Sequence, residues 1–170
     1  MAGGQGDARK VTGPVGQHIK GKCCLENEAV YRIREADSQD EEVAEFLDEL
    51  HRITFFDSAP VPPFDAGYWW LAFCGAEPVA FAGLVRSTHA PNAGYLCRVG
   101  VIRRHWGRSL QLRLLRAAAS RARRNGWHSI VSDTTDNVVS ANNFIRAGYR
   151  LYRPKLPWGW PNTLYWLKSM

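Results

Sequence analysis

The chain has 170 residues, of which 45% are hydrophobic, 22% charged and 12% aromatic, a composition typical of one soluble domain rather than a disordered or fibrous chain. No apolar run reaches the roughly eighteen residues of a membrane span, and the first residues lack the apolar stretch of a secretory signal, so we expect a cytoplasmic protein. The formal net charge of +6 is unevenly placed: Glu35 to Asp65 holds ten acidic residues and one arginine, whereas Arg98 to Arg124 holds nine arginines and no acid.

Residues 1–28 differ from the rest of the chain. They contain several glycines, few large apolar side chains and no periodic pattern, so burial cannot offset the entropy of ordering them. We expect a disordered tail there and one folded domain over residues 29–170. The four cysteines form no CxxC pair and the five histidines have no metal-ligand spacing, so we expect neither a disulfide scaffold nor a metal site.

The first half of the domain combines strands with one amphipathic helix. Apolar side chains recur at helical spacing from Val43 to Ile53, and the opposite face of this helix is acidic. A Pro-rich stretch interrupts regular structure, and two apolar runs around a Gly-Ala-Glu-Pro turn then predict a hairpin. The expected elements, in chain order, are a strand over 30–36, a helix over 40–54, and strands over 67–74 and 79–86.

The second half alternates strands and helices. Leu110, Leu114 and Leu115 share one face of a helix whose other face is rich in arginine, and Gly126 and Gly148 are typical helix stops. The expected elements are strands over 95–102, 129–134, 149–153 and 163–168, and helices over 109–125 and 138–147. This order predicts an α/β fold with a mixed sheet of about seven strands and helices packed on it.

The junction between strand 95–102 and the next helix is the most informative segment. The first N–H groups of a helix lack internal partners and carry the positive end of its dipole, which suits a phosphate. Gly107 permits close approach of the backbone to such an anion. The loop also carries three arginines, Arg103, Arg104 and Arg108. A plain strand-to-helix turn with solvated arginines is the alternative interpretation.

Two motifs follow each other at a characteristic distance. Val99-Gly100-Val101 precedes Trp106-Gly107-Arg108-Ser109-Leu110-Gln111, and Asn137, Ser140, Phe144, Gly148 and Tyr149 are spaced as in N-x-x-S-x-x-x-F-x-x-x-G-Y. The first resembles the V-x-V strand end and R-G-x-G-x-G/A pyrophosphate loop of the GNAT N-acetyltransferase superfamily, with Trp106, Ser109 and Gln111 at positions usually held by other residues. The second resembles the superfamily motif N-x-x-A/S-x-x-x-Y-x-x-x-G-F. With the element order, the resemblance covers roughly residues 29–170.

The resemblance implies a GNAT-like acyl-CoA N-acyltransferase fold and transfer of an acetyl group from acetyl-CoA to a primary amine by direct attack on the thioester. In this family two adjacent parallel strands part and pantetheine lies between them, which here implies strands 95–102 and 129–134. The residues thereby placed at the cofactor are Val99, Gly100, Val101, Trp106, Gly107, Arg108, Ser109, Leu110, Gln111, Asn137 and Phe144.

The acid and base of the reaction are less evident. The amine must lose a proton and the leaving thiolate must gain one. Phe144 stands where many relatives carry a tyrosine that protonates the thiolate, and a phenyl ring has no proton to give. Asp133 and Tyr95 are the candidates, followed by Asp65, His105 and Tyr152. Capping of the following turn is the alternative role for Asp133, and a base acting through water needs none of these side chains.

The resemblance implies a small-molecule or peptide amine as the acceptor. We expect no membrane partner and no nucleic acid, and we leave a homodimer open. The acidic helix, with Glu41, Glu42, Glu45 and Glu49, favours a cationic acceptor, and the Trp158-Gly159-Trp160 loop is a candidate wall of its pocket. Two rival functions remain: a coenzyme A-binding protein without transferase activity, and a nucleic-acid-associated protein that uses its arginine-rich helix.

Overall fold

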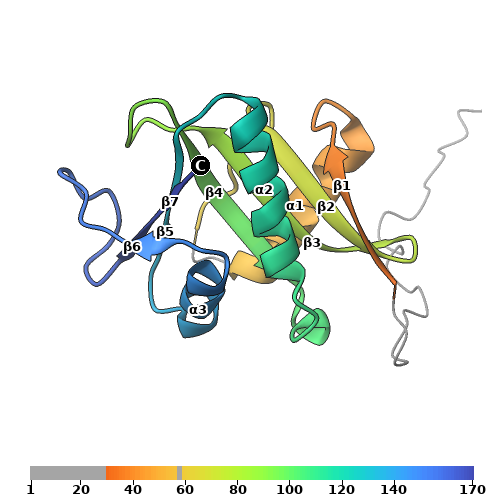
Figure 1. The fold of residues 1–170 in the computed structure, drawn as a ribbon. Coiled ribbons are helices and arrows are strands. Elements are labelled where there is room, and N and C mark those ends of the chain that lie inside the picture. The colour runs from red at the N-terminus through yellow and green to blue at the C-terminus, as the bar shows by residue number, and fades with distance from the viewer. Residues whose placement is uncertain (1–29, 57–58) are drawn as a thin grey trace, which may run out of the picture.

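The computed structural model describes residues 30–56 and 59–170, which form a seven-stranded mixed sheet with helices on both faces (Figure 1). The tail expected over residues 1–28 lies outside the described residues. The predicted order of elements and the mixed sheet are confirmed. The elements are β1 (Tyr31–Ala36), α1 (Glu41–Phe55), β2 (Tyr68–Cys74), β3 (Glu77–Arg86), β4 (Ala93–Val101), a 3₁₀ turn (Arg103–His105), α2 (Leu110–Arg124), β5 (Ser129–Thr134), α3 (Val138–Arg146), β6 (Arg150–Leu151) and β7 (Leu164–Ser169).

The sheet has the strand order β1-β2-β3-β4-β5-β7-β6, and its strands are antiparallel except for β4 and β5. These two parallel strands pair only from Ala93 to Tyr95 and from Ser129 to Val131, although β4 runs on to Val101 and β5 to Thr134. We call the separation of the strands beyond Tyr95 and Val131 the fork. The parting of these two strands that the resemblance implies is therefore confirmed.

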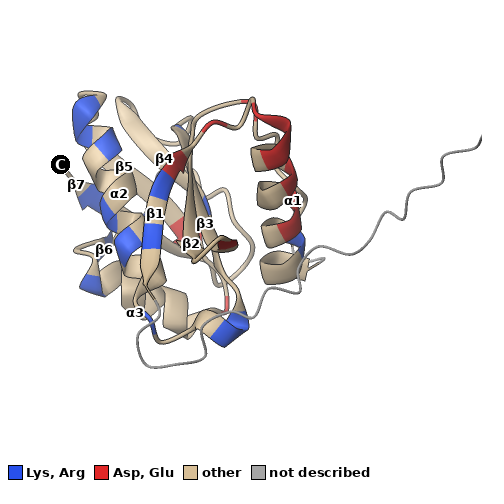
Figure 2. Cartoon of the chain, turned by 90° about the vertical axis from the view of Figure 1, so that its right-hand side faces the viewer, with Lys and Arg blue, Asp and Glu red and all other residues tan. Residues whose placement is uncertain are grey.

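Alternate side chains of the strands fill two cores, one on each face of the sheet. On one face Leu47 and Leu50 of α1 pack against Trp69, Leu71 and Phe81. On the other face α2 and α3 cover a larger core, and Figure 2 shows these two helices opposite α1. Burying one large apolar side chain contributes about 1.5–3 kcal/mol, so both layers hold the sheet and the fork in place.

The acidic residues of α1 and the arginines of α2 lie on opposite sides of the sheet (Figure 2). Asp40 caps α1 by accepting hydrogen bonds from the N–H groups of Glu42 and Val43. The acidic residues of α1 lie along its side turned away from the sheet (Figure 2), so they do not line the strands that carry the predicted site. The acidic helix therefore does not itself support a cationic acceptor.

Several arginines of the basic segment have partners within the chain. Arg121 and Arg124 both pair with Glu35 of β1, Arg113 donates to the carbonyl of Tyr31 at 2.8 Å, and Arg121 also lies 4.5 Å from the ring centroid of Tyr68. These contacts attach α2 to the strands β1 and β2. Part of the arginine face of α2 therefore serves packing instead of facing solvent.

Most element boundaries differ from the prediction by one residue, and larger differences occur in β3, β4 and β6; β4 begins at Ala93, two residues before the predicted start. The β2–β3 turn consists of Gly75 and Ala76 alone, because the φ of 62° at Gly75 allows a two-residue connection and β3 then begins at Glu77. Pro78 is tolerated in β3 because the pairing register shifts beside it, between Ala72 and Phe73. β6 has two residues where five were expected.

Candidate active site

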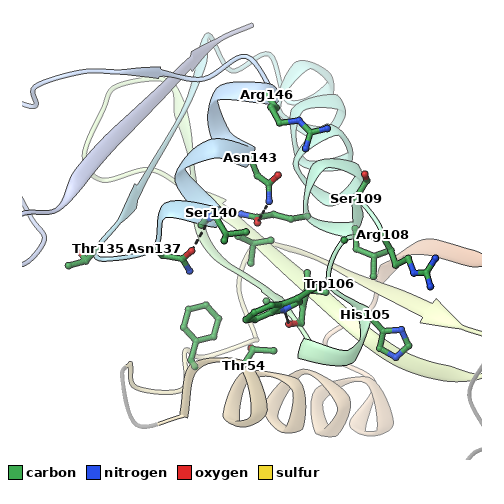
Figure 3. A pocket seen from close by; sticks show the side chains of 18 residues that line it. Thr54, His105, Trp106, Arg108, Ser109, Thr135, Asn137, Ser140, Asn143 and Arg146 are labelled. Carbon is green, nitrogen blue, oxygen red and sulfur yellow. Dashed lines mark hydrogen bonds between the residues drawn. The ribbon is translucent and has the colours of Figure 1, made fainter. Parts of the chain in front are cut away.

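A cavity of about 480 Å³ lies between the diverging ends of β4 and β5 and the first turns of α2 and α3 (Figure 3). It brings together all the predicted cofactor residues except Phe144: Val99, Gly100, Val101, Trp106, Gly107, Arg108, Ser109, Leu110, Gln111 and Asn137. Its described lining includes two arginines, Arg108 and Arg146, and no aspartate or glutamate. The cavity is therefore electropositive.

The start of α2 forms the anion-binding end of this cavity. Gly107 and Ser109 have φ angles of 77° and 56°, and these left-handed residues turn the chain sharply into the helix. Within the described part of the chain, no side chain caps α2, since Ser109 makes no capping hydrogen bond. The first N–H groups of α2, from Leu110 and Gln111 on, therefore remain available to donate hydrogen bonds to an anion in the cavity.

The Trp106 side chain spans the loop that leads into α2. Its Nε1–H donates to the carbonyl oxygen of Val101 at 2.8 Å, and the Arg103 guanidinium lies 5.8 Å from its ring centroid. The indole thus ties the end of β4 to the loop. Trp106 holds the loop by one hydrogen bond and its contact with Arg103, at a position where the family that the sequence resembles usually has arginine or glutamine.

A row of polar side chains on α3 forms the opposite wall. Asn137, Ser140, Asn143 and Arg146 follow each other at three-residue intervals and all line the cavity. The Asn137 side chain caps α3 by accepting from the N–H of Ser140 at 2.8 Å. The sequence motif pointed to Asn137 and Ser140, whereas Asn143 and Arg146 were missed, although their three-residue spacing was a visible signal.

Gln111 bridges α2 and α3. Its Nε2 donates to Ser140 Oγ and its Oε1 accepts from Asn143 Nδ2, both at 2.8 Å. Figure 3 labels these two partners on α3. The family's usual glycine or alanine at this position has no side chain long enough for these bonds. The long side chain therefore gives this chain a direct polar link between the two helices.

The end of α1 supplies a wall that sequence reasoning did not find. Thr54 and Phe55 line the cavity beside Val99 and Gly100. A Cβ added at Gly100 would lie 2.3 Å from Thr54 Oγ1 and 2.6 Å from Phe81 Cε1, so the glycine is needed for this close approach. The contact joins positions nearly fifty residues apart, and no local pattern in the sequence indicates it.

Phe144 does not lie at the cofactor cavity, which corrects the expectation for this residue. Its side chain is 1% exposed and stacks on Trp166, with ring centroids 5.5 Å apart, and meets the edge of Tyr149 at 4.9 Å. Helix α3 turns its polar row to the cavity and Phe144 to the core. The ring stabilises the fold, and it neither contacts the cavity nor donates a proton.

Asp133 and Tyr95, the predicted acid/base candidates, are brought together on the α1 side of the sheet at the fork. The Tyr95 hydroxyl donates to Asp133 Oδ1 at 2.7 Å, and Trp158 Nε1 donates to the same oxygen at 2.8 Å. Burial, with the nearby Asp133 carboxylate, raises the pKa of Tyr95 well above its ordinary value. Tyr95 therefore remains a protonated donor at neutral pH. Among the described residues, the hydrogen bonds of the Asp133 carboxylate go to side chains, and none caps the following turn.

The remaining candidates lie in different surroundings. His105 is 4% exposed, its Nδ1 lies 3.0 Å from the Tyr31 hydroxyl, and its buried Nε2 has no hydrogen-bond partner. Burial, together with Arg104 and Arg108, lowers the pKa of His105, so the ring is neutral at neutral pH. Asp65 is exposed, whereas the Tyr152 hydroxyl is buried without a partner near the Asp133 charge.

Residues 30–56 and 59–170 contain no group of three or more His, Cys, Asp or Glu side chains placed to hold a metal ion. None of the helices in this part of the chain combines the length and apolar character needed to cross a membrane.

Comparisons with known proteins identify related sequences and folds. Residues 27–149 match the family model of the acetyltransferase (GNAT) family, and no curated protein matches the chain. Similar structures include an acetyltransferase of the GNAT family from Staphylococcus aureus (18% identity, 82% of this chain and 99% of that chain, TM-score 0.63). Also similar is a Bacillus subtilis acetyltransferase in complex with CoA (14% identity, 83% of this chain and 99% of that chain, TM-score 0.64). A third similar structure is yncA of Salmonella typhimurium with its cofactor acetyl-CoA (16% identity, 82% of this chain and 94% of that chain, TM-score 0.64). At these identities the structures show a shared fold.

Proposed function

This chain belongs to the acetyltransferase (GNAT) family, and we propose that it transfers the acetyl group of acetyl-CoA to a primary amine that attacks the thioester directly. One observation carries the proposal: an acid-free cavity joins the uncapped start of α2 to the fork between β4 and β5. An anionic nucleotide fits the uncapped start of α2. An extended chain with amide groups fits the fork, because β4 beyond Tyr95 has no paired strand on the side of β5.

The residues that line the cavity have the donors and positive charges that acetyl-CoA would need. The N–H groups from Gly107 to Gln111 would hold its pyrophosphate, supported by the charges of Arg108 and Arg146. The backbone around Val99 and Val101 would bind the pantetheine amides. Asn137 would contact the cofactor from α3.

The closed end of the fork supports a position for the reacting atoms. Ser132 Oγ donates to the carbonyl of Leu96 at 2.9 Å, so the first position beyond the paired residues is closed by a side chain. A pantetheine arm that follows β4 from the start of α2 therefore brings its thioester toward this closed end. Tyr95 and Asp133 lie there, on the side of the sheet that faces α1.

We assign the proton transfers to the same place. The amine nitrogen attacks the carbonyl carbon, a backbone N–H of β4 stabilises the oxyanion, and the C–S bond breaks as the N–C bond forms. Asp133 accepts the proton that the amine loses, and the thiolate leaves to be protonated by solvent, because Phe144 offers no proton. Tyr95 is a positioning residue, since its hydroxyl orients the Asp133 carboxylate.

The experiment measures binding and turnover separately. Calorimetric titration with acetyl-CoA tests the cavity, and release of free thiol across a panel of primary amines tests transfer. Asp133→Asn should retain acetyl-CoA affinity and lose most turnover, whereas Tyr95→Phe should keep affinity and lose less turnover. Binding with no turnover on any amine would instead favour a coenzyme A-binding protein without transferase activity.

A cytoplasmic location and a homodimer formed through the C-terminal strands belong to the same proposal. Among the described residues, β6 pairs with β7 at Trp166 and Leu167 and Tyr152 adds one bond to Tyr165, so the two ends of β7 have no paired strand on the outer side, where a second copy would pair. Light scattering after gel filtration measures the mass in solution and tests the dimer.

A further inference from the structure

Aromatic side chains from β4, from β7 and from the loop between β6 and β7 surround Asp133. Tyr165 of β7 lies directly opposite Asp133 in the strand pairing, and the N–H of Tyr152 bonds to the carbonyl of Tyr165. Tyr95 reaches Asp133 from β4, and Trp158 from the loop between β6 and β7. We call these five residues the Asp133 cluster.

The cluster lies on the half of the face that α1 leaves uncovered. Helix α1 packs on β3 and β4, whereas β5 and β7 carry Asp133 and Tyr165. Trp158 crosses this region with its ring stacked on His89, the centroids 4.0 Å apart, and set edge-on to Tyr165 at 4.6 Å. Contacts on several sides thus hold the indole next to the carboxylate.

The Asp133 carboxylate has one engaged oxygen and one that is available. Both donors, the Tyr95 hydroxyl and Trp158 Nε1, bind Oδ1, and the described residues place no hydrogen bond on Oδ2. A carboxylate offers about four acceptor positions, so a further donor can bind at Oδ2. Since both donors are neutral, they orient the group without cancelling its negative charge.

Within the described chain, no cation neutralises this charge. None of the ion pairs between described residues includes Asp133. Arg98 of β4 is turned toward α1 instead: its Nε donates to His51 Nε2 at 3.2 Å and its Nη2 to the carbonyl of Pro60 at 3.1 Å. The Asp133 charge is therefore left for a ligand.

The chemistry of the cluster selects an organic cation. The faces of tryptophan and tyrosine rings attract positive charge, and a carboxylate without a cationic partner does so more strongly. The cluster has a single carboxylate and no further metal-binding side chain, so an ammonium group suits it better than a metal ion. The buried, unpartnered hydroxyl of Tyr152 adds a polar atom beside the same charge.

We infer that the Asp133 cluster is the acceptor subsite and that it binds an alkylammonium ion, with the charge on Asp133 Oδ2 and the alkyl groups against Trp158. This inference rests on the proposed function and adds the substrate class: strongly basic alkylamines, which arrive protonated, in preference to arylamines or neutral amides. The bound ammonium passes one proton to Asp133, and the neutral amine then attacks the thioester.

A non-reacting cation tests the subsite without acetyl-CoA. Tetramethylammonium is titrated into the ¹⁵N-labelled chain while the side-chain N–H signals of the seven tryptophans are followed by NMR. The Trp158→Phe variant identifies the Trp158 signal by its absence. We expect that signal to move with saturation in the wild-type chain, and tert-butanol, a neutral molecule of similar shape, to leave it in place at the same concentrations.

Two variants that each remove one carboxylate test the charge of Asp133. Asp133→Asn keeps the size and the Oδ1 acceptor and should weaken tetramethylammonium binding about tenfold or more, whereas Asp65→Asn removes an exposed carboxylate outside the cluster and should bind within about threefold of wild type. Equal binding by the Asp133→Asn variant, or an equal response to tert-butanol, overturns the inference. The tert-butanol comparison uses the wild-type chain, so it tests the dependence of binding on positive charge even if the Asp133→Asn variant fails to fold. Because no cofactor is present, the result is independent of whether acetyl-CoA binding and transfer succeed.

Discussion

Glutamate in place of Gly107 should weaken acetyl-CoA binding about 30-fold. A Cβ built on Gly107 meets no atom within 4 Å, so a side chain there projects into open space beside the uncapped start of α2. Two unit charges 4 Å apart interact by about 4 kcal/mol at an effective dielectric near 20, and exposure of this loop reduces the repulsion from a phosphate to about 2 kcal/mol. That energy corresponds to roughly 30-fold in Kd.

A matched series of Gly107→Ala, Gly107→Lys and Gly107→Glu separates this repulsion from backbone strain. All three share the left-handed backbone, with a φ of 77°, which costs a residue with a Cβ about 1 kcal/mol. That cost lowers the urea midpoint of each variant equally and leaves affinity unchanged. In calorimetric titrations the Ala variant should bind acetyl-CoA about as well as wild type, and the Lys variant, which places a positive charge beside the pyrophosphate, should bind more tightly. If the folded Glu variant binds as tightly as the Ala variant, the pyrophosphate does not lie at the start of α2.

Three further predictions concern stability and are measured by urea unfolding. Gly100→Ala places a Cβ 2.3 Å from Thr54 Oγ1 and should cost about 1–3 kcal/mol; an unchanged midpoint would contradict the close packing of α1 on β4. Burial, with the Arg98 charge, lowers the pKa of His51 below its ordinary 6.5, so below about pH 6.5 the unfolded chain binds more protons and the folded state loses stability as the pH drops. His51→Gln should reduce this pH dependence of stability, and equal slopes of stability against pH in the two proteins would refute the role of His51. Gln111→Ala removes two hydrogen bonds between α2 and α3 and should cost about 1–2 kcal/mol, whereas no loss would mean that the bridge does not form in solution.

The fold was largely predictable because its signals are local. The helical spacing from Val43 to Ile53, the glycine stop at Gly126 and the two-residue alternation of the strands each depend on nearby residues, and the structure places elements there. The Gly107 loop and Asn137 were likewise found from short motifs. Phe144 shows the limit of such a motif, because spacing alone does not indicate which side of a short helix faces the core.

The parts of the site that were missed depend on contacts between distant segments. Thr54 reaches the cavity only because α1 crosses the end of β4 at Gly100. The pairing of Asp133 with Trp158 likewise depends on how the loop between β6 and β7 folds over β5. Sequence patterns indicated that Asp133 and the Trp158 loop were candidates, but the hydrogen bond that joins them is a property of the tertiary structure.

The fork reduces the backbone connection between the two halves of the sheet. Three residue pairs between β4 and β5 connect the four-stranded half of the sheet to the three-stranded half, so backbone hydrogen bonds alone form a short hinge between them. A ligand whose amide groups bond along the open edge of β4 would occupy the place of a missing strand and stiffen this hinge. The co-substrate would then act as a structural member of the sheet, and its departure would leave the two halves joined by these three pairs, by the Ser132–Leu96 hydrogen bond and by α2, which contacts both halves.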